Sequence, residues 1–333
     1  MKFQRIFLLV FFVITNLAAQ EFKSEHFTIE KLSDGIFAVI HKAGGYAICN
    51  AGIVNLGDET LVYDCFISPL AAKDLKTAAE ELTGNKVKYL VNSHFHNDHI
   101  RGNQIFTDAE IIATERIKDL IETNEPEELK SETEIVGPMI EKTLKQIEKE
   151  NDLNMFEEHK MWLDYYKAIQ QSLDEYKITL PNKLFTDTLV IKGKKRNAAI
   201  INLGKGHTEE DIVLWLPEEK ILFGGDLMFA ERHPFLGDGF PNEWINCLEK
   251  FKKLDAKYIV PGHGNVGSNE DIDKLKLYIQ KVDNIIDNAI ADNLTIDQLK
   301  QTEIPDEFKS WRLSRFYMLN LIIGYQKKVG ANK

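Results

Sequence analysis

The sequence predicts an α/β fold, and three observations lead to it. Short apolar strand patterns alternate with stretches of helical spacing along most of the chain. The two halves of the chain also repeat one order of features, in which a turn, a strand and an acidic residue precede a helix, a strand and a His. Finally, 333 residues with 44% hydrophobic and 28% charged side chains suit one globular α/β core carrying an insertion.

The first part of the chain is predicted to form a β-meander followed by a helix. Its strand patterns, separated by Gly- and Asn-containing turns, occupy the ranges 27–32, 35–40, 47–54 and 61–64. The apolar spacing over 71–82 predicts a helix that stops before Gly84, a typical C-terminal residue. A short apolar strand over 87–91 comes next, and another is expected over 111–113.

The segment 114–178 differs in composition and is predicted to be a helical insertion. It has few β-branched residues and many Glu and Lys, and apolar side chains such as Phe156, Tyr166 and Ile169 follow helical spacing. About three helices are expected, because Gly137-Pro138 should break or kink the run. The aromatic stripe is interpreted as packing rather than as part of a cofactor site.

Strand patterns resume after the insertion and give way to helices at the end of the chain. The predicted strands occupy the ranges 188–191, 198–203, 212–216, 221–223 and 257–260, with a helix over 243–254 before the last of them. Ser268 and Thr295 suit helix starts with a capping box, so the segment 268–333 is predicted to be a helical tail. The predicted domain spans 20–333 and includes the insertion and this tail.

The repeated order of features is visible as two pairs of short similar segments. The segment 87–94 resembles 256–263, and the segment 58–64 resembles 218–226. Both copies end in a candidate metal ligand, which indicates two similar halves that face one site.

The N-terminus is predicted to be a secretory signal peptide over residues 1–19. Lys2 and Arg5 precede an apolar core over 6–14, and small residues follow it. This core is short for a membrane span, so an uncleaved anchor is the less favoured alternative. The mature chain is therefore expected to be periplasmic or secreted and to have no stable membrane anchor.

Charge and cysteine content exclude several classes of protein. The formal net charge of −11, with both signs interspersed, shows no basic stripe of the kind that binds nucleic acid. The three cysteines, Cys49, Cys65 and Cys247, form no disulfide framework and are expected to be small buried side chains. A small-molecule substrate is the expected partner.

The chemistry of the chain is expected to centre on the motif 94–99, which follows the strand over 87–91. It supplies His94, His96, Asp98 and His99, and so many polar side chains at a strand end indicate a metal site. His94 and His96 could bind one ion, while Asp98 and His99 point to a second ion about 3.5–4 Å away. Three further candidates lie in Gly-containing turns, each after an apolar strand: His207, Asp226 and His263.

This set of residues resembles the metallo-β-lactamase superfamily, with its His-x-His-x-Asp-His motif followed by separate His, Asp and His residues. The resemblance covers about 27–267 apart from the insertion. It implies a four-layer αββα sandwich of two similar halves, here with a helical insertion and a helical C-terminal tail. It also assigns the ligands: His94, His96 and His207 to a first metal, Asp98, His99 and His263 to a second, and Asp226 as the bridge. Asp64 matches an acidic residue of the family that supports a ligand.

The resemblance further implies a hydrolase that uses two Zn²⁺ ions, with iron or manganese as less favoured metals. A metal-bridging hydroxide would attack an amide- or ester-type bond, in a β-lactam or a lactone for example, and Asp98 would orient the nucleophile or shuttle a proton. Asp226 stands where the best-known β-lactamase class has Cys, so the set is more similar to the glyoxalase-II, lactonase and general hydrolase branches.

Two alternatives stay open within the superfamily, a phosphodiesterase and an iron-bound redox enzyme. The acidity of the chain and its lack of a basic binding surface count against the phosphodiesterase. The insertion is expected to shape the substrate pocket. Further candidates for the lining of the pocket follow Asp226 in the chain: His233, Phe235 and Trp244.

Overall fold

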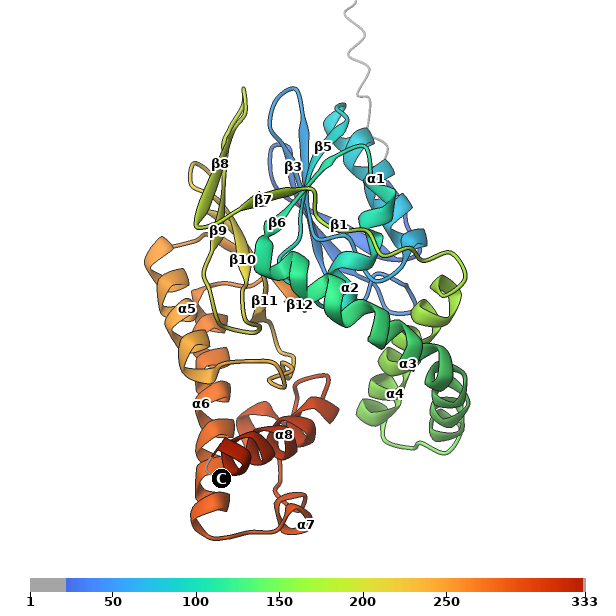
Figure 1. Cartoon of the computed structure of the whole chain (residues 1–333), viewed down its shortest axis with the longest axis vertical. Helices are drawn as coiled ribbons and strands as arrows, with labels where there is room; N and C mark the ends of the chain where they lie inside the picture. The colour runs from blue at the N-terminus through green and yellow to red at the C-terminus, as the bar shows by residue number, and fades with distance from the viewer. Residues whose placement is uncertain (1–21, 332–333) are drawn as a thin grey trace, which may run out of the picture.

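Two β-sheets form the centre of the molecule, and helices cover both of their outer faces (Figure 1). The computed structural model describes residues 22–331, so the predicted signal peptide lies outside the described residues. Within 22–331, no helix has both the length and the apolar character that crossing a membrane requires. The architecture confirms the predicted α/β class.

The first sheet has seven strands, and its spatial order follows the chain. In that order the strands are β1 (Phe27–Ser33), β2 (Ile36–His41), β3 (Ala51–Asn55), β4 (Thr60–Tyr63), β5 (Val87–Val91), β6 (Glu110–Thr114) and β7 (Lys183–Phe185). Strands β1 to β4 pair antiparallel, whereas β4 to β7 pair parallel.

The second sheet has five strands in the reverse of chain order. They are β12 (Tyr258–His263), β11 (Ile221–Phe229), β10 (Ile212–Leu216), β9 (Asn197–Asn202) and β8 (Thr188–Lys192). Only β11 and β12 pair parallel. The α-helices are α1 (Pro69–Thr83), α2 (Asn97–Ile100), α3 (Glu115–Ile147), α4 (Leu153–Ser172), α5 (Pro241–Leu254), α6 (Asn269–Ala291), α7 (Ile296–Leu299) and α8 (Arg315–Ala331), with 3₁₀ turns η1 (Arg101–Ile105) and η2 (Asp306–Phe308).

The two halves repeat one β-α-β unit, as the aligned sequence segments predicted. Strands β4 and β5 enclose α1, and strands β11 and β12 enclose α5. The registers also agree, because Leu61 pairs with Tyr89 in the first sheet while Ile221 pairs with Tyr258 in the second. The carboxyl ends of both parallel pairs therefore deliver their polar residues to one edge of the sandwich.

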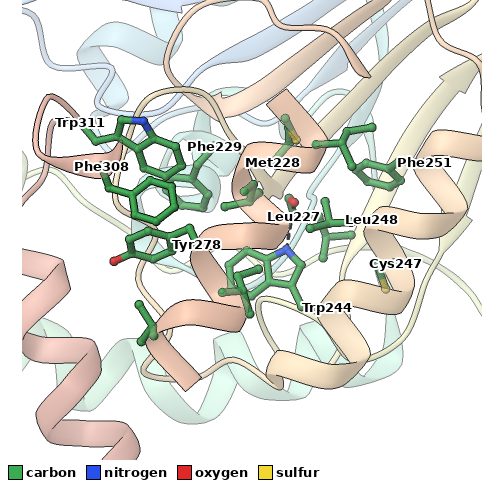
Figure 2. Packing of buried hydrophobic residues seen from close by; sticks show 14 of the residues in the cluster. Leu227, Met228, Phe229, Trp244, Cys247, Leu248, Phe251, Tyr278, Phe308 and Trp311 are labelled. Carbon is green, nitrogen blue, oxygen red and sulfur yellow. Dashed lines mark hydrogen bonds between the residues drawn. The ribbon is translucent and has the colours of Figure 1, made fainter. Parts of the chain in front are cut away.

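Three of the four apolar clusters within residues 22–331 hold the layers together, and the fourth packs the insertion against Ile67. Ile36, Val54 and Phe223 belong to the cluster between the sheets, while a second cluster lies under α1. A third joins the second sheet to α5 and α6, and Figure 2 shows Trp244 and Tyr278 within it. The Trp244 Nε1 atom donates to the Leu227 carbonyl oxygen at 3.0 Å, so this buried indole is fully paired (Figure 2).

The insertion differs from its prediction in one respect. Two helices, α3 and α4, occupy it rather than about three, because α3 continues through Pro126 and Pro138. Proline removes one backbone hydrogen bond but does not have to end a helix that packs against a neighbour. The capping boxes predicted at Ser268 and Thr295 are present at the starts of α6 and α7.

The close approach of the sheets gives a stability prediction at Gly52. A Cβ atom there would overlap the Phe223 ring of the facing sheet. Gly52→Ala is therefore expected to destabilise the fold by about 1–3 kcal/mol through overpacking. Gly137→Ala is the matched control, because its Cβ would meet nothing within 4 Å in α3 and helix propensity favours Ala. Urea unfolding of both variants measures the difference, and equal midpoints would contradict the prediction.

Candidate metal centre

The seven predicted ligand residues come together at the edge of the sandwich. Three groups of potential ligand atoms form there, each with its atoms within 4.8 Å of one another, and the first two share one carboxylate. The first contains His94, His96, His207 and Asp226, and the second contains His99, Asp226 and His263. The third contains Cys49, Asp98 and His99, and the Asp98 Oδ2 atom also lies 3.3 Å from His263 Nε2 of the second group.

The elements that carry these residues explain their convergence. The motif 94–99 follows β5 and forms the turn into α2, while His207 lies in the loop between β9 and β10. The prediction that Asp226 and His263 lie in turns was wrong, since Asp226 is inside β11 and His263 is the last residue of β12. Gly225, with φ of +52°, lets β11 bend close to Ser93 there.

Asp226 occupies the centre of the cluster. Its Oδ1 atom lies 3.1 Å from His99 Nε2, and its Oδ2 atom lies 3.4 Å from His207 Nε2 and 3.5 Å from His263 Nε2. One carboxylate thus contacts imidazoles from both groups, which is the position of a bridging group.

The buried ligand atoms of the cluster are suited to bind metal ions. His94 Nε2, His99 Nε2 and Asp226 Oδ1 are buried, and none of them makes a hydrogen bond of acceptable geometry, although the last two atoms lie 3.1 Å apart. In addition, His207 Nε2 and His96 Nδ1 face each other at 3.0 Å. Buried polar atoms left unpaired are costly, and cations bound to the two groups that share Asp226 would give these atoms partners. Mixed nitrogen and oxygen donors suit zinc and also suit iron or manganese.

Electrostatics favour the same interpretation. Burial lowers the pKa of His207 to about 3 and holds that of His94 well below its usual value. Neutral imidazole is the form that binds metal. Burial opposes ionisation of Asp98, but His99 and His263 lower its pKa to about 2. The centre therefore offers ionised carboxylates and neutral nitrogens at His94 and His207. Burial opposes protonation of His263 as well, but Asp226 and Asp98 raise its pKa to about 9, so a metal ion would displace a proton there.

Supporting residues orient the candidate ligands from outside. His99 Nδ1 lies 2.8 Å from Asp64 Oδ2, so Asp64 supports a candidate ligand as the resemblance implied. His96 Nε2 lies 3.1 Å from Asp238 Oδ2, a contact that sequence reasoning missed. Such carboxylate contacts fix the tautomer and the orientation of an imidazole.

The cysteines are free and buried, as predicted. The Cys49 thiol lies close to the centre and donates to the Asp98 backbone carbonyl at 2.8 Å. Burial raises the pKa of Cys49 to about 12, so it acts as a thiol donor that holds the Asp98 backbone.

A cavity of about 550 Å³ opens onto the centre. Its lining includes His96, Asp98, His207, Asp226 and His263. The helical insertion contributes to its wall, through Asn124, Glu128, Met161, Trp162 and Tyr165. The aromatic stripe of α4 is therefore partly a pocket wall, which the packing interpretation missed.

The prediction that three residues following Asp226 in the chain line the pocket was wrong for two of them. Phe235 does line the cavity, whereas His233 and Trp244 are buried in the core. Trp244 nevertheless packs against a candidate ligand, because its ring lies at a centroid distance of 5.0 Å from that of His207.

The C-terminal tail closes the far side of the cavity. The ring of Phe316 lies 5.3 Å from Trp162 of α4 and 5.5 Å from Phe235. The Leu313 backbone N–H also donates to Glu158 of α4 at 2.8 Å. The insertion and the tail thus meet over the pocket.

Comparisons with known proteins agree with this geometry. The family model described as the metallo-beta-lactamase superfamily matches residues 44–263. A metallo-beta-lactamase type 2 of Bacteroides fragilis is 34% identical over 122 residues, which are 34% of this chain and 49% of that protein. A beta-lactamase-like protein 2 homolog of Caenorhabditis elegans is 24% identical over 267 residues, 79% of this chain and 70% of that protein.

Solved structures share the fold. A metallo-beta-lactamase from Pontibacter korlensis matches with a TM-score of 0.55 and 17% identity, covering 76% of this chain and 99% of that one. VMB-1 matches with a TM-score of 0.55 and 21% identity, covering 78% and 99%. The curated relatives are matched over less of their length, since the match spans about half (49%) of the Bacteroides fragilis protein and 27% of a Bacillus cereus metallo-beta-lactamase type 2.

Proposed function

Because this chain belongs to the metallo-β-lactamase superfamily, we propose that it is a metal-dependent hydrolase of an amide- or ester-type bond. The observation that carries this proposal is the pair of ligand groups that share Asp226 beside a cavity. We further propose that the protein is exported and acts on a small molecule, as its predicted signal peptide and acidic charge favour.

The contacts at the centre support a division of the ligands between two ions. His94, His96 and His207 would hold one ion and Asp98, His99 and His263 the other, with Asp226 shared. When bound, two such ions supply Lewis-acid activation of a carbonyl oxygen and acidify water. Zinc is the proposed metal, since the donors are imidazole and carboxylate.

Side chains of this chain would perform the remaining tasks. Asp98 lines the cavity and stays ionised, so its carboxylate can orient an attacking water and accept its proton. His263 Nε2 lies 3.3 Å from that carboxylate and fixes its position. The aromatic wall of Trp162, Phe235 and Phe316 would hold an apolar part of the substrate and exclude water from the reacting bond.

The experiment that tests this function is a turnover panel on metal-loaded protein, with metal analysis of the same sample. The panel contains nitrocefin-type β-lactams, lactones, thioesters and bis(4-nitrophenyl) phosphate. Hydrolysis of one of the first three classes is expected, with two zinc ions per chain. Turnover of the phosphodiester alone, or a single iron ion, would overturn the proposal.

Arg232 provides a prediction about the substrate. Its side chain lines the cavity, and its Nη1 atom donates to the Glu231 backbone carbonyl. Burial, and then the nearby Arg312, lowers the pKa of Arg232. A bound anion would therefore stabilise the charged guanidinium group. We expect Arg232→Ala to raise KM for a carboxylate-bearing substrate about 10- to 100-fold, since a hydrogen bond to a charged group contributes about 1.5–3 kcal/mol.

The control for this prediction is a neutral analogue of the same substrate. Its KM is expected to stay unchanged in Arg232→Ala, and Arg232→Lys is expected to recover part of the binding of the anionic one. An equal rise in KM for both substrates would show that Arg232 has no role in binding an anion.

A further inference from the structure

Three carboxyl groups of α3 gather beside the metal centre on one face of the helix. Glu125, Glu128 and Glu132 are spaced by three and four residues, which places them together. They face Arg101 of η1, which is 1% exposed, and the backbone turn that carries Asn97. This cluster lies outside the predicted ligand set.

The cluster contains more carboxyl groups than cationic groups. Arg101 Nε and Nη2 donate to Glu125 at 3.1 and 3.3 Å, and Arg101 Nη1 lies 2.7 Å from Glu132 Oε2. Glu128 accepts from Asn97 Nδ2 at 2.7 Å, and the same nitrogen also lies 3.1 Å from Glu132 Oε1. Of the three, it is the carboxyl with no cation at ion-pair distance among residues 22–331. One guanidinium serves two of the carboxylates, and Glu128 is the surplus one.

Glu128 is also the member that reaches the cavity. It lines the same space as His96 and Asp98, and its partner Asn97 lies between those two residues in the chain. Glu125 and Glu132 are buried away from that space. The Glu128 carboxyl therefore has one oxygen held by Asn97 and sits where a bound substrate would extend from the metal centre.

The surroundings of Glu128 favour a protonated carboxyl near neutral pH. Burial raises its pKa to about 7, with Arg101 opposing and the two neighbouring carboxyls adding to the rise. The titratable and charged groups that face it are Arg101, Glu125, Glu132, His96 and Tyr165. A group that titrates near the working pH is suited to proton transfer.

We propose that Glu128 is a catalytic general acid that donates its proton to the leaving group of the substrate. This inference rests on the hydrolase function proposed above. As the carbon–heteroatom bond breaks, its electron pair goes to the leaving atom, which takes the Glu128 proton. The water consumed supplies the hydroxyl group of the acid product and one proton, and that proton returns through solvent to the Glu128 carboxylate.

The test compares Glu128→Gln with wild type on two esters of one acid, a 4-nitrophenyl ester and an alkyl ester. An alkoxide needs a proton to leave, whereas 4-nitrophenolate does not. The variant is expected to lose about 10²- to 10⁴-fold in kcat on the alkyl ester and to keep the wild-type rate on the nitrophenyl ester. Glu127→Gln, at an exposed position of α3, is the control and should match wild type on both.

The pH dependence gives a second measurement. Because a raised pKa means that Glu128 is protonated below about pH 7, wild-type kcat on the alkyl ester should fall as pH rises through that value. This limb should be absent in Glu128→Gln. Infrared spectroscopy of the metal-free protein should likewise show a protonated-carboxyl band that titrates near neutral pH and is missing from the variant.

The outcomes separate the two proposals. If wild type hydrolyses both esters and the variant loses equally on both, the residue only positions Asn97 and the general-acid role is wrong. Loss of metal from Glu128→Gln would likewise show that Glu128 has a structural role and is not the general acid. If wild type hydrolyses neither these esters nor any β-lactam, lactone or thioester, the proposed function fails, and the general-acid role fails with it. A carboxyl band that titrates near pH 7 and is missing from Glu128→Gln would in that case show only that the acidic cluster holds a proton.

Discussion

Replacing Asp226 with alanine is expected to abolish activity and to lower the metal content of the protein. Its two oxygens contact His99, His207 and His263 at 3.1–3.5 Å, so both ligand groups lose a member at once. Loss of a residue that only supports a ligand costs about 10- to 100-fold in affinity or activity. Loss of a shared ligand should exceed that range. Turnover and metal analysis on the same preparation measure both effects.

Two controls accompany this prediction. Asp226→Asn keeps the shape and one carbonyl oxygen, so it should fold like wild type and retain part of the metal. Asp238→Ala removes a carboxylate that contacts only the outer nitrogen of His96, and it should cost no more than about 100-fold. Full metal content together with full activity in Asp226→Ala would refute the shared-ligand proposal.

The candidate ligands could be predicted because the chemistry is concentrated in the sequence. Four of them lie within six residues, and the other three follow apolar strands. Their secondary structure was less predictable at Asp226. Gly224-Gly225 has the composition of a turn, yet all nine residues of β11 are buried and the strand continues through both. A strand interior accepts Gly where another chain segment approaches closely, as Ser93 does here.

The pocket could not be predicted in the same way, since its walls come from segments that are distant in the chain. Trp162 of α4 and Phe316 of α8 meet only because the insertion and the tail converge. Aromatic residues at helical spacing occur both in packed cores and in pocket walls. The spacing alone therefore does not distinguish the two. Glu128 was missed for a related reason. The spacing of the three Glu residues shows a shared face, but only the fold shows that this face meets Arg101 and the cavity.

Arg101 is expected to have the largest effect on stability of any single side chain in the acidic cluster. It pairs with Glu125 and Glu132, and all three side chains are at most 8% exposed. Arg101→Met keeps most of the apolar stem but leaves the buried carboxylates without their cation. Breaking a buried pair by removing one partner costs about 3–5 kcal/mol, and that is the loss expected in the free energy of unfolding, measured with urea.

The control for Arg101→Met is the exposed pair between Arg116 and Glu209. Both of these side chains are 44% exposed, so Arg116→Met should change the free energy of unfolding by about 0–1 kcal/mol. Equal effects of the two substitutions would mean that the buried cluster does not depend on its arginine.

The effect of Arg101→Met should also depend on pH, and the direction can be worked out. Burial already raises the pKa of Glu128 and Glu132 in the wild type, and loss of the guanidinium raises them further. A carboxyl whose pKa is higher in the folded than in the unfolded state binds more protons when folded, so stability falls as pH rises between the two values. The loss in Arg101→Met should therefore be larger at pH 8 than at pH 5. A loss that does not vary with pH would mean that the methionine variant repacks and that charge is not what Arg101 contributes.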